Sequence, residues 1–398
     1  MTGLLSTETV GAISLGLLLF QGTATLILLS RLLKGAFRRP PLKPKLPAPE
    51  LLGAVSVVIP TLNEAERISP CLAGLTRQSY EVREIIVVDS NSQDGTPELV
   101  KTAATFDPRF RLMSDPPLPS GWVGRPWALH TGFLSSSSKS KWVLGIDADT
   151  LPQNGLVASL ILAAEEQGYD LVSLSPQFIL KYPLEWLLQP ALLMTLLYRF
   201  DSAGVDSQTP EGVMANGQCF LCRRSVLEQL GGYKSAAGSF CDDVTLARHA
   251  AACGFKVGFF DGAKLIKVRM YEGALETWQE WGRSLDLKDA CLPGQIWGDL
   301  WLLLFVQALP LVLSALSIGC WIVGYSSVAL TAATGLNLFL VAIRIGMLLA
   351  IAPCYDRSQT SFLNTSLFWL SPFADFLAVF RIFLSALTQP KKWRGRNY

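Results

Sequence analysis

The chain has 398 residues, of which 50% are hydrophobic and only 17% are charged, and its mean hydropathy is +0.34. These values exclude a disordered protein and an ordinary soluble globular protein, and they indicate association with a membrane bilayer. The net charge is +2, so no overall excess of basic residues argues for nucleic acid as a partner.

The first apolar run predicts a transmembrane anchor in residues 1–33. Its segment 9–30 carries no charged residue and is long enough for a helix that crosses a bilayer, which needs roughly 20 residues. A basic linker follows in residues 34–53, and its proline-rich stretch 38–50 favours an extended spacer over a helix. Because basic residues follow the anchor, the positive-inside rule places the next part of the chain in the cytoplasm.

Residues 54–293 have the composition of a soluble domain in which short β-branched runs alternate with helical patterns. The predicted elements are strands at 54–60, 83–89 and 141–147 and helices at 66–78 and 96–105. This order predicts an α/β fold with a mostly parallel sheet, which binds its ligands beyond the carboxyl ends of the strands.

Further apolar segments indicate a multi-pass integral membrane protein. Residues 184–200 are too short for a typical span and are predicted to form an interfacial helix, with a buried core helix as the alternative. Residues 300–352 predict two transmembrane helices. Residues 362–387 form a third apolar segment that is re-entrant, interfacial or spanning. A single span here would place the basic tail 388–398 outside, against the positive-inside rule, so a hairpin is preferred.

Two carboxylates follow the strand at 141–147. Asp147 and Asp149 are two residues apart, so in an extended chain they point to the same side, at the ligand-binding edge of the sheet. Mg²⁺ and Mn²⁺ bind carboxylate oxygens together with substrate phosphates. The pair therefore predicts a divalent cation site for a nucleoside diphosphate, with an exposed acidic turn as the alternative.

The segments 60–64 and 87–96, together with Asp147 and Asp149, resemble the nucleotide-binding half of family 2, GT-A type glycosyltransferases. In that family the corresponding segments bracket the base and ribose of the donor. The resemblance implies donor-binding roles for Pro60, Thr61, Glu64 and Asp89, and a donor role for Asp147. It gives Asp94 a supporting role, for which a simple turn is the alternative.

The segment 124–132 resembles a family segment that lies beside the nucleotide and carries a lysine and an asparagine. Arg125 stands in the lysine position and His130 in the asparagine position. Arginine keeps the positive charge and adds a planar fork for phosphate oxygens, so Arg125 is predicted to contact the pyrophosphate. His130 is either a ligand or a hydrogen-bonded structural histidine.

The segment 241–254 resembles the acidic segment that carries the catalytic base of the family. The resemblance implies that Asp243 is the base and that Asp242 replaces the preceding glutamate. A carboxylate beside an acceptor hydroxyl can take its proton as it attacks the anomeric carbon, and a single displacement inverts the configuration. Capping of the following helix is the structural alternative.

The segment 277–284 occupies the place of a family motif on the acceptor side. Trp278, Gln279, Trp281 and Arg283 are the candidate acceptor-side residues, but the motif is incomplete because Arg283 is not followed by tryptophan. Processive synthases of the family use the complete motif, so its departure favours the addition of one sugar. The two tryptophans either stack on an acceptor or lie at the membrane surface.

A finer resemblance, carried by the segments 121–130 and 278–289, is to bacterial carotenoid glycosyltransferases, among them the cyanobacterial carotenoid 2'-O-glycosyltransferases of myxol glycoside synthesis. It implies an inverting enzyme that moves one sugar from a nucleotide diphosphate sugar to a hydroxyl of an apolar lipid, with carotenoid favoured. The alternatives are a hopanoid, sphingolipid or polyprenyl phosphate acceptor, and a catalytically inactive membrane scaffold.

Overall fold

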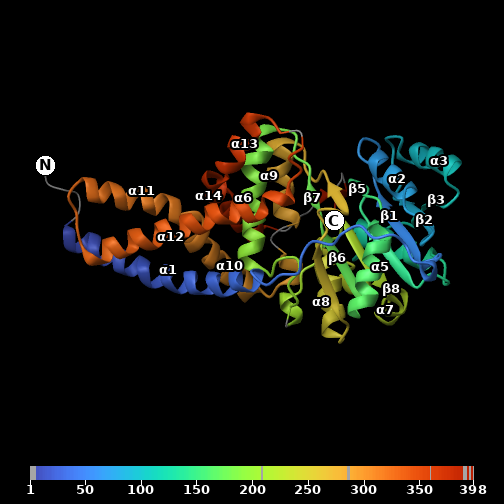
Figure 1. The fold of residues 1–398 in the computed structure, drawn as a ribbon, viewed down its shortest axis with the longest axis horizontal. Helices are drawn as coiled ribbons and strands as arrows, with labels where there is room; N and C mark the ends of the chain where they lie inside the picture. Colours follow the sequence, from blue (N-terminus) through green and yellow to red (C-terminus); the bar gives the residue numbers. More distant parts are fainter. Residues whose placement is uncertain are drawn as a thin grey trace.

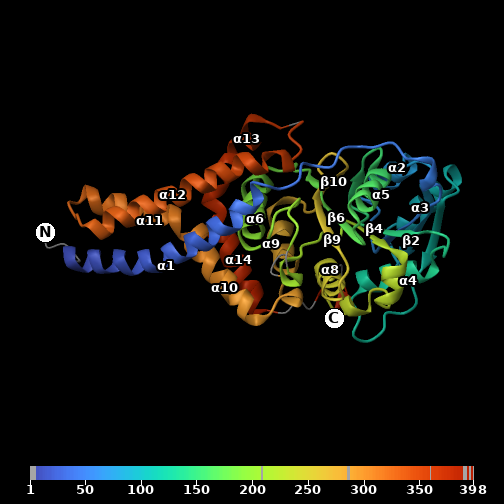
Figure 2. The ribbon, with the colours of Figure 1, turned by 60° about the horizontal axis from the view of Figure 1, so that its bottom comes forward.

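The computed structural model describes residues 6–207, 209–284, 287–358 and 360–388 and the backbone of residues 392–393 and 396–397. Three regions follow one another along its longest axis (Figure 1). An α/β domain lies at one end, a layer of shorter helices lies in the middle, and a group of long helices projects from this layer away from the domain (Figure 2).

The α/β domain is built on a seven-stranded sheet with the strand order β3-β2-β1-β4-β8-β6-β9. Its strands are β1 (Val55–Thr61), β2 (Val82–Asp89), β3 (Phe110–Ser114), β4 (Trp142–Ile146), β6 (Leu171–Ser175), β8 (Cys219–Arg223) and β9 (Val257–Asp261). Strand β8 runs antiparallel to β4 and β6, and the other adjacent pairs are parallel. The predicted α/β fold with a mostly parallel sheet is confirmed, and the carboxyl ends of β1, β2 and β4 meet at one edge.

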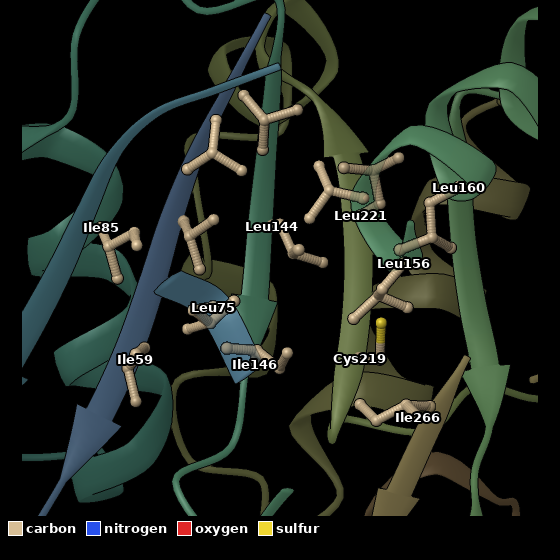
Figure 3. Close-up of a cluster of buried hydrophobic side chains, with 14 of the residues drawn as sticks. Ile59, Leu75, Ile85, Leu144, Ile146, Leu156, Leu160, Cys219, Leu221 and Ile266 are labelled. Atoms are coloured by element: carbon tan, nitrogen blue, oxygen red, sulfur yellow. The ribbon is translucent and has the colours of Figure 1, made fainter. Parts of the chain in front are cut away.

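Helices cover both faces of this sheet, which explains why its central strands are almost wholly apolar. The covering helices are α2 (Ser69–Thr76), α3 (Thr96–Phe106), α4 (Gly124–Ser135), α5 (Leu156–Gln167), α7 (Arg224–Gln229) and α8 (Asp242–Ala252). Figure 3 shows one buried layer, in which Ile59, Leu144 and Cys219 pack between the strands and helices. On the other face, a Cβ at Gly132 would come within 2.3 Å of Val58, so glycine permits the close contact of α4 with β1.

A smaller sheet connects the domain to the middle layer. Its strands, in the order β5-β10-β7, are β5 (Thr150–Pro152), β10 (Ile266–Val268) and β7 (Gln177–Phe178). An isolated bridge pairs Phe178 with Tyr355, which follows the last of the long helices. Near the end of the chain, β11 (Lys392–Trp393) pairs with β12 (Arg396–Asn397).

The apolar regions form the remaining helices. They are α1 (Thr7–Gly35), α10 (Pro293–Leu303), α11 (Leu309–Ile322), α12 (Val328–Ile351), α13 (Phe362–Trp369) and α14 (Asp375–Leu387). Within the described residues, three stretches are long and apolar enough to cross a membrane, namely Thr7–Gly35, Pro293–Ile322 and Val328–Cys354. Helices α13 and α14 are bent by 58° relative to each other, as in a broken span or a re-entrant loop.

A buried ion pair joins α12 to α14. The Nε atom of Arg344 donates a hydrogen bond to Oδ2 of Asp375 at 2.7 Å, and its Nη2 atom donates to Oδ1 at 2.9 Å. The amide of Gln307 donates to Oδ1 of Asp375 at 3.1 Å and to the carbonyl oxygen of Ala191 at 2.8 Å. Burying an ionisable side chain among apolar helices is costly, and pairing of this kind offsets that cost.

Helix α6 (Pro183–Arg199) coincides closely with the segment predicted as an interfacial helix, but its surroundings favour the alternative of a core helix. Trp186, Ala191 and Met194 are at most 1% exposed, and α6 packs against α13, α14 and α9 (Gly273–Ser284). Segments that are distant in sequence cover this helix. The local pattern of apolar residues in α6 does not predict this packing.

Some helix boundaries differ from those predicted. Helix α2 begins at Ser69 instead of Glu66, with Pro70 in its first turn, where proline is compatible with a helix. Helix α1 continues to Gly35 and enters the expected linker.

Candidate active site

A cavity of about 530 Å³ lies beyond the carboxyl end of β4. Asp147 and Asp149, the two carboxylates that follow this strand, both line it, together with Asp242 and Asp243 from the first turn of α8. The structure therefore brings together four acidic residues that the sequence predicted for the donor, the metal and the base.

Arg125, at the start of α4, connects these two acidic pairs. Its Nε atom donates a hydrogen bond to Oδ1 of Asp147 at 2.9 Å, and its Nη1 atom donates to Oδ2 of Asp242. Its Nη2 atom donates to the carbonyl oxygen of Gly217 at 2.7 Å. The guanidinium group thus lines the cavity while it fixes the relative positions of β4 and α8.

Asp243 is held by backbone groups. Its Oδ2 atom accepts a hydrogen bond from the backbone N–H of Gly217 at 2.5 Å, and its Oδ1 atom accepts one from Val244 at 2.8 Å. Burial raises the pKa of the Asp243 carboxyl above its ordinary value. A carboxylate of raised pKa is a better proton acceptor, and this property suits a general base.

Asp242 is also buried, with 3% of its surface exposed. Burial raises its pKa to about 7, the positive charge of Arg125 opposes this rise, and the negative charges of Asp243 and Asp147 add to it. Asp242 and Asp243 both lie in the first turn of α8, where a negative charge interacts favourably with the helix dipole.

The residues predicted to bind the base and ribose lie at the ends of β1 and β2, outside the lining of this cavity. Asp89 accepts hydrogen bonds from the hydroxyl of Thr61 at 3.1 Å and from the backbone N–H and hydroxyl of Ser92 at 2.9 and 2.6 Å. Pro60 precedes Thr61 in the same strand, and the buried Glu64 follows in the next loop. These residues form the adjoining part of the same sheet edge.

Two other residues of the donor motifs have structural contacts. Asp94 accepts hydrogen bonds from the backbone N–H of Ala65 at 2.8 Å and from the hydroxyl of Thr96 at 2.6 Å, so it joins two loops at the sheet edge. His130 is 6% exposed, and its Nδ1 atom accepts a hydrogen bond from the backbone N–H of Tyr233 at 3.4 Å. His130 does not line the cavity, which favours its structural alternative.

The structure describes the side chains of two of the four predicted acceptor-side residues, Trp278 and Gln279. Trp278 packs against Arg381 of α14, and Gln279 is exposed; neither lines the cavity. The side chains of Trp281 and Arg283 lie outside the described residues. Helix α9 instead presents Glu276 and Glu280, which are one turn apart and therefore share a face.

Arg67 is a cavity residue that the sequence reasoning missed. Its Nη2 atom pairs with the carboxylate oxygens of Glu276 at 3.1 and 3.4 Å. The only signal in the sequence was its position three residues after Glu64, in a motif whose other members were singled out.

Much of the remaining wall of the cavity is apolar. One face of α6 contributes Leu192, Leu193 and Leu196, with Gln189 one turn earlier. Other apolar lining residues include Phe178, Met214, Met270, Tyr271, Leu287 and Tyr355. One cavity therefore joins an acidic edge of the sheet to an apolar surface beside the membrane-type helices.

The chemistry of the acidic edge fits a divalent cation that is shared with a substrate. Asp147 and Asp149 supply carboxylate oxygens, which Mg²⁺ and Mn²⁺ prefer. Within the described part of the chain, no group of three or more histidine, cysteine, aspartate or glutamate side chains is arranged to hold a metal ion by itself. A cation at this edge would therefore complete its coordination with phosphate oxygens and water.

Comparison with known proteins relates this domain to glycosyltransferases. Residues 56–231 match the family model described as glycosyl transferase family 2. A 4,4'-diaponeurosporenoate glycosyltransferase of Staphylococcus haemolyticus is 28% identical over 239 residues, which cover 59% of this chain and 62% of that protein. The probable glycosyltransferase YdaM of Bacillus subtilis is 26% identical over 235 residues, covering 58% and 54% of the two chains. The matched region is thus less than two thirds of the length of either relative.

A solved structure extends the likeness of fold to nearly the whole chain. The mannosyltransferase PcManGT from Pyrobaculum calidifontis, determined in complex with GDP-Man and Mn²⁺, superposes with a TM-score of 0.50 and 19% sequence identity. The superposition covers 95% of this chain and 98% of that chain. The fold is therefore GT-A-like, and the matched region indicates a glycosyltransferase domain.

Proposed function

We propose that this protein is an inverting glycosyltransferase that transfers a single sugar from a nucleotide diphosphate sugar to a hydroxyl group of a membrane lipid. One observation carries the proposal: the cavity that contains the acidic residues is continuous with the apolar face of α6. A water-soluble acceptor would not need such a wall, whereas a lipid hydroxyl could reach Asp243 while its hydrocarbon part contacts leucine side chains.

Asp243 acts as the general base in this reaction. It takes the proton of the acceptor hydroxyl while the acceptor oxygen forms a bond to the anomeric carbon of the sugar. The bond between that carbon and the diphosphate oxygen breaks, and the diphosphate leaves with the electron pair. Attack opposite to the leaving group inverts the anomeric configuration.

Arg125 and Asp242 maintain the geometry of this reaction. The Asp242 carboxylate holds the guanidinium group of Arg125 between α8 and Asp147, near the diphosphate position. Asp149 and Asp147 would hold a divalent cation, Mg²⁺ or Mn²⁺, which supplies positive charge for the leaving diphosphate. Pro60, Thr61, Glu64 and Asp89 form the base and ribose end of the donor site, as the resemblance to family 2 implies.

The favoured acceptor is a carotenoid of the kind used by cyanobacterial 2'-O-glycosyltransferases. Support comes from the apolar and aromatic lining of the cavity and from relatives whose names include 4,4'-diaponeurosporenoate glycosyltransferase. A hopanoid, a sphingolipid or a polyprenyl phosphate would use the same wall, and these acceptors are the alternative outcomes of the test.

The orientation in the membrane follows from charge. The three apolar stretches would cross the bilayer, and Arg31, Lys34, Arg38 and Arg39 lie at the end of α1 that faces the α/β domain. The positive-inside rule then places the domain on the cytoplasmic side, where nucleotide sugars are made available to it.

The test is to incubate the full-length protein in detergent with a panel of UDP- and GDP-linked sugars, Mg²⁺ or Mn²⁺, and a total lipid extract that contains carotenoids. Mass spectrometry of the extracted lipids should show one added hexose-type mass on a carotenoid. A product on a hopanoid, sphingolipid or polyprenyl phosphate would change the acceptor. If no lipid gains a sugar with any donor, the glycosyltransferase proposal fails and a scaffold role remains.

A further inference from the structure

Two glutamines in the cavity have polar atoms that protein groups do not satisfy. Gln189 on α6 is 6% exposed, and Gln218, which directly precedes β8, is 5% exposed. Both line the cavity. Among the residues that the structure describes, Nε2 of Gln189 and Oε1 of Gln218 have no hydrogen-bond partner.

The stability of the fold gives no reason for burying these two amide groups. A buried polar group without a hydrogen bond is costly, and such groups are few in native proteins. Leu192, Leu193 and Leu196 occupy the same face of α6 as Gln189, so leucine is compatible with this wall. An amide at position 189 therefore indicates that a ligand supplies the missing partner.

Gln218 lies at the reacting end of the cavity. Its backbone carbonyl oxygen accepts a hydrogen bond from the N–H of Asp147 at 3.4 Å. The preceding residue, Gly217, donates to Asp243 and accepts a hydrogen bond from Arg125. The free Oε1 atom of Gln218 can accept a hydrogen bond from a hydroxyl group bound beside the base.

Gln189 lies farther along the apolar wall. Leu196, on the same face of α6, packs with Cys241 and Val244 beside Asp243. Gln189 precedes Leu196 by seven residues, which corresponds to about 10 Å of helix rise. Trp186, one turn before Gln189, contacts Tyr355, so this end of the wall is aromatic.

We propose that the preferred acceptor carries two oxygen atoms separated by an apolar stretch and that Gln218 and Gln189 each form a hydrogen bond to one of them. Gln218 accepts a hydrogen bond from a hydroxyl at the reacting end, and Gln189 donates one to a second oxygen farther along the acceptor, on the scale of the roughly 10 Å of helix rise that separates Gln189 from Leu196. This inference rests on the proposed function, and it adds a specificity rule: a lipid with one oxygen leaves the buried amide of Gln189 unpaired.

The first experiment measures binding and requires no turnover. The full-length protein in detergent is heated with 1-decanol or 1,10-decanediol at matched concentrations in the micelle, and the Tm is recorded. The wild type should gain more stability from the diol than from the alcohol. In Gln189→Leu this difference should vanish, and the Tm without ligand should equal or exceed that of the wild type. The matched control is Gln229→Leu, because Gln229 is an exposed glutamine.

Two results would overturn the inference. One is an equal response of the wild type to both probes. The other is a lower Tm of Gln189→Leu without ligand, because it would mean that the amide has a structural partner such as a buried water.

The second experiment measures transfer to the lipid that the wild type glycosylates. Gln218→Leu and Gln189→Leu should each raise the acceptor KM at least tenfold and leave the donor KM within twofold. Unchanged acceptor KM values in both variants would refute the inference but not the proposed function. The proposed function fails separately, if the wild type transfers no sugar to any lipid while the diol still binds better than the alcohol.

Discussion

The two walls of the cavity are built in different ways. The wall proposed to bind the donor, the donor wall, includes a short motif that directly follows a strand, Asp147 and Asp149 after β4, and Arg125 at the start of α4. The acceptor wall is assembled from α6, the segment around Tyr271, helix α9 and Tyr355, which are far apart in the sequence. One wall is a property of local sequence, and the other depends on tertiary packing.

The difference also appears in the interactions that hold each wall. Charged hydrogen bonds fix the donor wall, as in the contacts of Arg125 with Asp147 and Asp242. Apolar contacts and buried ion pairs, among them Arg344 with Asp375 and Arg269 with Glu185, hold the helices behind the acceptor wall. We therefore expect changes at the donor wall to affect chemistry first and changes behind the acceptor wall to affect stability first.

The largest effect is expected from Asp243→Asn. Loss of the general base should lower the rate of transfer by about 10²- to 10⁴-fold. The measurement is the rate of transfer by the detergent-purified protein. This rate is divided by the fraction of folded protein, because the substitution also changes the group that accepts the hydrogen bond from the N–H of Gly217. The exposed Glu228→Gln serves as a control that should retain activity. Normal transfer by Asp243→Asn would remove this residue as the base.

Arg344→Leu tests the other wall. The substitution leaves the carboxylate of Asp375 buried without its cation, which typically costs about 3–5 kcal/mol of stability. The double variant Arg344→Leu with Asp375→Leu should recover most of this loss, because no charge is then stranded. Unfolding in detergent measures both. A small effect of the single variant would mean that the ion pair does not stabilise the helices behind α6.

The same contrast explains what could be predicted from sequence. The strands, the mostly parallel sheet and the acidic residues Asp147, Asp149, Asp242 and Asp243 were predicted because each depends on a short run of residues with a defined spacing. Arg125 was also placed near them, but its simultaneous contacts with β4 and α8 could not be read from a one-dimensional pattern.

The acceptor wall was harder to predict, for a physical reason. Helix α6 has the composition of an interfacial helix, and the alternative of a core helix is favoured by the helices packed on it. In α9 the prediction named Trp278, Gln279, Trp281 and Arg283, and among the side chains that the structure describes the rotation of the helix places Glu276 and Glu280 at the cavity instead of Trp278 and Gln279. That rotation is set by contacts such as Arg381 with Trp278, between residues about a hundred positions apart.

The pH dependence of transfer should report on the ion pair between Arg125 and Asp242. Burial raises the pKa of Asp242 to about 7, so its carboxyl becomes protonated as the pH falls through this value and its ion pair with Arg125 weakens. Protonation of Asp242 should therefore lower kcat/KM on the acid side of neutral pH. In Asp242→Asn the activity should be lower at pH 8, and the component of the acid limb that belongs to Asp242 should be absent. A wild-type profile that is flat from pH 6 to pH 8 would exclude this role of Asp242.

The smallest effect is expected from the ion pair between Arg67 and Glu276. It links the loop after β1 to α9. Arg67 and Glu276 are partly exposed, with 19% and 30% of their side-chain surfaces accessible, and such pairs contribute about 0.2–1 kcal/mol. A double-mutant cycle with Arg67→Met and Glu276→Gln should therefore give a coupling energy below about 1 kcal/mol, equivalent to less than about fivefold in the donor KM. The exposed pair of Lys45 and Glu166 provides a reference cycle that should leave the donor KM unchanged. A coupling energy well above this limit would mean that the two walls act as one unit. The weak coupling expected here would instead let the acceptor wall change its specificity while the donor wall keeps its chemistry.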